Sequence, residues 1–122
     1  MKSTTTDLPI VYSCSGCSSA AQMANHIAIK LDRLDLAEMS CIAGVGGNVK
    51  KLVKTAKAGR KIVVIDGCPL ACSKACLSNH DIVPDLHYDL SKLGVKKVQR
   101  EDFDPNQAAE ILDEITLEIQ QL

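Results

Sequence analysis

The chain has 122 residues, a length that suits one domain, and its hydrophobic content of 46% is enough for a packed core. Its 14 basic and 15 acidic side chains nearly cancel and three residues are aromatic, which excludes a strongly basic or base-stacking nucleic-acid surface. No apolar run approaches the ~20 residues of a membrane span, and the polar first residues lack the apolar segment of a secretory signal, so we expect a cytoplasmic protein without membrane contact.

The first regular elements expected along the chain are a short strand and a helix. Residues 9–13 carry β-branched and aromatic side chains that predict the strand. Either Ser18 or Ser19 can cap the helix that follows. Apolar residues then recur at helical spacing and predict one buried stripe: Ala20, Ala24, Ile27, Leu31 and Leu34. Residues 1–8, which are mostly polar, are expected to form a flexible tail ahead of the strand.

The middle of the chain predicts two further strands with a helix between them. Residues 37–41 form the weaker strand, and the glycine-rich residues 43–48 are expected to form a loop. A helix over residues 49–58 would end at Gly59, which suits the left-handed conformation just past a helix terminus. Residues 61–66 predict the clearest strand, because they are apolar on both faces, as in a central parallel strand covered by helices.

The last part of the chain predicts two helices and a strand near the sheet edge. A proline opens the helix expected over residues 69–79. Residues 85–90 alternate in polarity after another proline, which predicts the edge strand, and residues 95–98 are a candidate for one more short strand. Asp104 then caps a final helix with a long apolar stripe. This stripe consists of Ala108, Ile111, Leu112, Ile115, Ile119 and Leu122.

The alternation of strands and helices predicts an α/β fold, a three-layer Rossmann-like or flavodoxin-like domain. Its sheet would contain four to five mostly parallel strands with helices on both faces, and residues 9–122 would form the single domain. Packing on the sheet accounts for the stripe of the final helix. The sequence therefore leaves both a monomer and a homodimer open, and it names no protein partner.

Six cysteines are the candidate functional residues. Cys14 and Cys41 end the first two predicted strands, and Cys68 follows the end of the third. The C-terminal ends of parallel strands meet at one edge of a sheet, where such folds hold ligands, so these thiols would converge if the strands are neighbours. Cys72 lies in the first turn of the next helix and leans back toward the same edge. Four thiolates around one ion form a closed tetrahedral zinc site with Zn–S distances near ~2.3 Å.

The two remaining cysteines have open roles. Cys17 follows Cys14 in a Cys-x-x-Cys pair, where a metal ligand, a redox partner of Cys14 and a spectator are all compatible with the sequence. Cys76 lies one helical turn, roughly 6 Å, beyond Cys72, so one ion cannot easily take both. A buried free cysteine also behaves as a small apolar side chain. Cys17 and Cys76 are therefore secondary candidates for metal binding.

The segment from Asp66 to Cys72, which reads Asp-Gly-Cys-Pro-Leu-Ala-Cys, resembles the signature of the DGC-domain family. Residues 14–16, 24–28 and 39–46 extend this resemblance, which covers most of the chain over residues 10–103. Members of the family are described as binding zinc through four cysteines. The resemblance implies no established biochemical activity, and it implies the same four zinc ligands that the strand ends select: Cys14, Cys41, Cys68 and Cys72.

We interpret the protein as a cysteine-ligated metal-binding protein, with zinc as the expected metal and a structural, sensing or metal-handling role without catalytic residues. One alternative is thiol redox or sulfur transfer, in which thiolates stabilised at helix N-termini would react. This alternative uses Cys14, Cys17 and Cys76. Another alternative is an iron–sulfur cluster, which four cysteines also suit although their spacing differs from common ferredoxin runs. The histidines are not needed once four thiolates complete the ligand shell.

Overall fold

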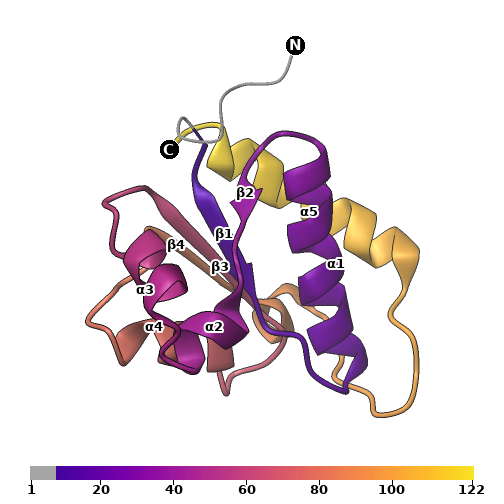
Figure 1. Cartoon of the computed structure of the whole chain (residues 1–122). Helices are drawn as coiled ribbons and strands as arrows, with labels where there is room; N and C mark the ends of the chain where they lie inside the picture. The colour runs from indigo at the N-terminus through magenta and orange to yellow at the C-terminus, as the bar shows by residue number, and fades with distance from the viewer. Residues whose placement is uncertain (1–7) are drawn as a thin grey trace.

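A four-stranded, all-parallel sheet is the centre of the computed structural model, which describes residues 8–122 (Figure 1). Its strands, in the order β2-β1-β3-β4, are β1 (Ile10–Ser13), β2 (Glu38–Met39), β3 (Ile62–Asp66) and β4 (Leu86–Asp89). The predicted α/β class, the parallel sheet and the edge position of β4 are confirmed. The tail expected over residues 1–8 lies, apart from Leu8, outside the described residues.

The order of the strands reverses the winding of the chain between β1 and β3. From β1 the chain moves outward to β2, returns across β1 to β3, and then moves outward again to β4. Right-handed crossovers place the helices of the two outward directions on opposite faces of the sheet. In doubly wound sheets the ligand crevice lies at the C-terminal ends of the two strands that flank such a reversal.

The long helices α1 (Ser19–Arg33) and α5 (Pro105–Ile119) cover one face of the sheet (Figure 1). Ser18 caps α1 by accepting a hydrogen bond from the Ala21 backbone N–H, as the sequence predicts. Asp104 likewise caps α5 through the Asn106 N–H. The buried residues of α5 are Ala108, Ile111, Ile115 and Ile119. Leu122 departs from the predicted stripe because it lies beyond the end of α5 and is exposed.

Three short helices cover the opposite face: α2 (Ile42–Gly46), α3 (Lys50–Ala56) and α4 (Cys72–Ser78). The core here is aliphatic apart from the fully buried ring of Tyr12. Val45, Ala56 and Leu77, one from each helix, pack against the sheet. The packing of Leu77 therefore attaches α4, with its two cysteines, to β3.

The prediction of a loop over residues 43–48 is wrong, because most of this segment belongs to helix α2. A Cβ atom on Gly44 would lie 1.9 Å from Leu52 Cδ1, and one on Gly46 would lie 2.9 Å from Cys76 Sγ. The glycines therefore permit close packing of α2 against α3 and α4 rather than a flexible turn.

Two other expected elements also differ. The helix expected from residue 69 begins only at Cys72, because Ala71 adopts a left-handed conformation with φ of 49°. Residues 95–98 do not form the extra strand. After a 3-10 helix η2 (Leu90–Leu93), Gly94 turns the chain with φ of 86°, and the following segment bonds to the start of α1 instead of the sheet. Within the described part of the chain, no helix is both long and apolar enough to cross a membrane.

Candidate functional site

A cavity of about 300 Å³ lies beside the C-terminal ends of β1 and β3, where the winding of the sheet reverses. Apolar and small side chains, among them Ala21, Ile42 and Leu70, form much of its wall. Five of the six cysteines also line it. They are Cys14, Cys17, Cys68, Cys72 and Cys76. The topology thus brings together thiols from two segments, residues 14–17 and 68–76, that are distant in the sequence.

Cys41 is the one predicted ligand that the structure does not place in the cavity lining. It precedes α2 at the end of the β2 segment, and its side chain is exposed. The next residue, Ile42, belongs to the cavity wall. Cys41 therefore lies at the border of the cavity, on the far side of β1 from Cys68.

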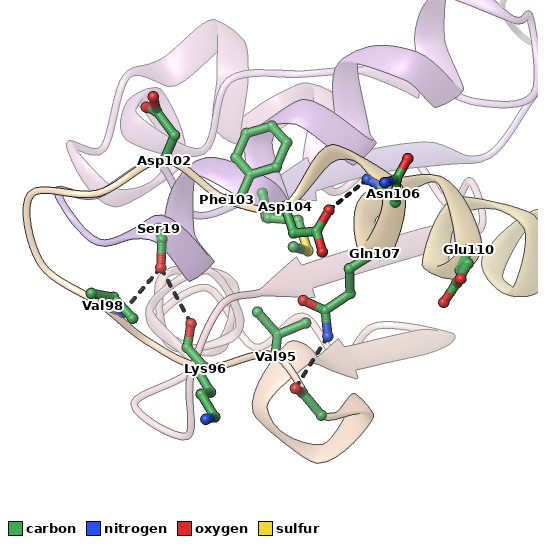
Figure 2. A pocket seen from close by; sticks show the side chains of 12 residues that line it. Ser19, Val95, Lys96, Val98, Asp102, Phe103, Asp104, Asn106, Gln107 and Glu110 are labelled. Carbon is green, nitrogen blue, oxygen red and sulfur yellow. Dashed lines mark hydrogen bonds between the residues drawn. The ribbon is translucent and has the colours of Figure 1, made fainter.

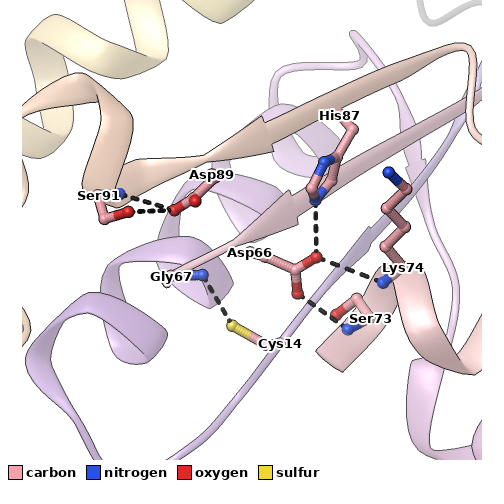
Figure 3. A network of polar contacts seen from close by, with 8 residues as sticks. All are labelled: Cys14, Asp66, Gly67, Ser73, Lys74, His87, Asp89 and Ser91. Atoms are coloured by element: carbon pink, nitrogen blue, oxygen red, sulfur yellow. Dashed lines mark hydrogen bonds and ion pairs between the residues drawn. The ribbon is translucent and has the colours of Figure 1, made fainter. Parts of the chain in front are cut away.

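The Cys14 thiol is held against the loop that follows β3. The backbone N–H of Gly67 donates a hydrogen bond to Cys14 Sγ over 3.2 Å (Figure 3). Burial raises the pKa of the Cys14 thiol to about 11, the Gly67 N–H opposes this rise, and the negative charge of Asp66 adds to it. Burial also raises the pKa of the Cys76 thiol. Both thiols are therefore protonated at neutral pH in this state, unlike the activated thiolates that the redox alternative requires.

A buried carboxylate fixes the position of α4 relative to β3. Asp66, at the end of β3, is 1% exposed and accepts hydrogen bonds from the Ser73 and Lys74 backbone N–H groups over 2.9 and 3.3 Å (Figure 3). His87 Nε2 on β4 lies 2.9 Å from the same carboxylate. Asp66 thus satisfies the first turn of α4 from outside the helix. This capping sets where Cys72 stands relative to the Cys68 loop.

Gly67 allows the same loop to approach the start of α1. A Cβ atom at this position would lie 2.7 Å from Ala20 C, 2.7 Å from Ala21 N and 2.8 Å from Ala20 O. These are backbone atoms of a helix, so no side-chain rotation can relieve the overlap. Each residue of the Asp66-Gly67-Cys68 segment therefore has its own role. The acid caps α4, the glycine lets the loop pass close to α1, and the cysteine places a thiol at the cavity.

Lys97 and Gln99, which follow η2 in the chain, form another part of the cavity wall, and the sequence did not predict them. Lys97 Nζ lies 3.6 Å from Cys68 Sγ, and the Cys17 thiol donates to Gln99 Oε1 over 3.3 Å. The role of His87 in supporting Asp66 was missed as well. These contacts join parts of the chain that are 21 to 82 residues apart, and no local motif predicts them.

Comparison with known proteins identifies the family. The DGC domain matches residues 10–115 of this chain. The chain belongs to the DGC-domain family. It is also 55% identical over 108 residues to the anaerobic and virulence modulator AnvM of Pseudomonas aeruginosa strain PAO1, a match that covers 88% of this chain and 82% of AnvM. No solved structure matches this DGC-domain protein.

Proposed function

We propose that this DGC-domain protein binds one zinc ion through the thiols at its cysteine-lined cavity. The observation that carries the proposal is the meeting of five cysteines in one cavity at the winding reversal of the sheet. Thiolates are soft ligands that suit zinc. The mostly apolar wall would shield such a site from competing oxygen ligands.

The donors fit zinc by their chemistry, although the side chains are not yet arranged around a point. Within residues 8–122, no three cysteine, histidine or acidic side chains form a ready-made group for a metal ion. Zinc binding would therefore require the cysteine side chains to turn toward one common point and to lose their protons. Cys14, Cys68 and Cys72 belong both to the ligand set expected from the family and to the cavity lining.

Three cysteines are candidates for the fourth ligand. The family resemblance names Cys41, at the border of the cavity, whereas the cavity lining itself adds Cys17 and Cys76. Cys76 would have to reach the ion held by Cys72 from one helical turn away. Cys76 packs so closely on α2 that a Cβ atom on Gly46 would reach its sulfur. Zinc bound through Cys76 would thus involve the contact between α4 and α2, and zinc bound through Cys41 would involve the link between β2 and α2.

A sensing role in the cytoplasm is the use of the site that we favour. AnvM is named as an anaerobic and virulence modulator, which is the name of a regulatory protein. A thiolate metal site responds to oxidants and to metal supply because oxidised or protonated thiols no longer bind zinc. We therefore infer that occupancy of the cavity, and the order of the surrounding helices, is the signal.

Elemental analysis of protein purified anaerobically without chelator tests the zinc proposal, with a visible spectrum of the same sample. We expect about one zinc per chain and no colour. Cys68→Ser and Cys72→Ser should lose the metal, and Ser15→Ala, in the same cavity wall, is the matched control. Loss in Cys17→Ser, in Cys41→Ser or in Cys76→Ser identifies the fourth ligand. Iron with brown absorbance would indicate an iron–sulfur cluster instead of zinc. Full zinc content in Cys68→Ser and Cys72→Ser would contradict the ligand assignment.

A further inference from the structure

One cation stands in the thiol cavity. Among the described residues that line it, Lys97 is the one with a charged side chain, and its ammonium lies 3.6 Å from Cys68 Sγ. Asp66, the buried carboxylate two residues before Cys68, is already engaged by two backbone N–H groups and by His87. The charge of Lys97 is therefore free to act on whatever enters the cavity beside Cys68.

The backbone on both sides of Lys97 is fixed by hydrogen bonds, which keeps the base of the Lys97 side chain beside the cavity. Ser19 Oγ donates to the Lys96 carbonyl and accepts from the Val98 N–H, over 3.2 and 3.0 Å (Figure 2). The Ser19 N–H also donates to the Val98 carbonyl over 2.8 Å. These bonds bracket Lys97 on both sides and attach it to the start of α1, next to the cavity.

We propose that the metal-free cavity selects small anionic disulfides for thiol exchange at Cys68, with Lys97 binding their anionic group. The Cys68 sulfur, after losing its proton to solvent, attacks one sulfur of the disulfide. The disulfide bond breaks as the new mixed disulfide forms, and the other half leaves with the electron pair and takes up a proton as a free thiol. Cys68 is oxidised and the leaving half is reduced, so the exchange needs no further oxidant.

The mouth of the cavity suits such a ligand. Cys68 is half-buried at a cavity that holds about 300 Å³, enough for a small organic disulfide to enter. Apolar wall residues such as Ile42 and Leu70 can contact its carbon chain. Ser73, another wall residue, has a buried hydroxyl without a hydrogen-bond partner among residues 8–122.

Three disulfides that share one S–CH₂–CH₂–X framework test the proposal, with X as sulfonate, hydroxyl or ammonium. Metal-free full-length protein is treated with each, and the rate of adduct formation at each cysteine is measured by peptide mapping and mass spectrometry. The readout is the ratio of the sulfonate rate to the hydroxyl rate at Cys68. Any effect of Lys97 on the reactivity of the sulfur itself cancels in this ratio, as would a purely structural effect.

We expect the sulfonate compound to react at Cys68 about fivefold faster than the hydroxyl compound, the factor for a unit charge pair near 4 Å in water-like surroundings. Lys97→Met should bring the ratio to about one, and Lys97→Glu should favour the ammonium compound. Added salt should weaken the preference. Lys96→Met, in the same exposed segment, is the matched control, and Cys41 is an internal control outside the cavity lining.

An unchanged ratio in Lys97→Met would overturn the proposal, as would an equal loss of the ratio in Lys96→Met. The measurement uses protein without metal, so it is independent of the zinc proposal. A protein that fails to bind zinc can still show the charge preference, and a zinc protein can lack it.

Discussion

Replacing Gly67 by alanine should strongly destabilise the protein, because the new methyl group has no space. Its Cβ would overlap three backbone atoms of α1 at 2.7 to 2.8 Å, closer than real Cβ contacts. Overpacking of this kind typically costs about 1–3 kcal/mol, and we expect the upper end, about 3 kcal/mol, because helix backbone cannot rotate away. For a domain of this size that loss lowers the melting temperature by roughly 10 °C.

Urea unfolding of metal-free protein, followed by circular dichroism, measures this loss without a contribution from bound ligand. Gly16→Ala is the matched control from the same cavity wall, because its Cβ would meet only Ala21 Cβ at an ordinary 3.4 Å. We expect the free energy of unfolding of Gly16→Ala to stay within about 0.5 kcal/mol of the parent value. A Gly67→Ala protein as stable as the parent, or a Gly16→Ala protein equally destabilised, would refute the close-approach argument.

Three further predictions concern Asp66, Ser18 and pH. Asp66→Ala should lower the free energy of unfolding in urea by about 3 kcal/mol, because two backbone donors of α4 and His87 lose their acceptor. His87→Gln keeps a donor and should lower it by about 1 kcal/mol. Ser18→Ala should cost about 1 kcal/mol by removing the cap of α1, and Ser18→Asp should restore it. Metal-free protein should lose stability as pH rises from about 9 toward 11, because burial raises the pKa of the Cys14 thiol to about 11 and the folded state then holds this proton more tightly than the unfolded chain. The loss should be smaller in Cys14→Ser, and stability that rises over this pH range would contradict the assignment.

The larger elements of the fold were predictable because their signals are local. The apolar repeat of α1 and α5, the caps Ser18 and Asp104, and the doubly apolar β3 all follow from short stretches of sequence. Helix α2 was not predictable in the same way. Its glycines suggest a turn when read locally, and only the neighbours Leu52 and Cys76 show that they are packing residues.

The residues of the candidate site also differ in whether a local signal predicts them. Cys14 and Cys68 were expected at one sheet edge because each follows a recognisable strand, and parallel topology brings strand ends together. Lys97 and His87 were not expected, because their partners lie 29 and 21 positions away in the chain. Nothing in the residues next to Lys97 or His87 indicates these pairings, which exist only once the sheet and the 95–99 segment have taken their places.

The residues of the cavity wall are synthesised at different times, because they lie in separate parts of the sequence. The thiols that precede β3 leave the ribosome well before α4, and the 95–99 segment, which is attached to the start of α1, follows later still. Cys14 lacks its Gly67 partner until β3 has been made, and Cys17 lacks its Gln99 partner until the 95–99 segment is in place, so the growing chain exposes its thiols to other proteins and to competing metals. A nascent chain of this architecture would therefore depend on the reducing capacity of its compartment until synthesis is nearly complete.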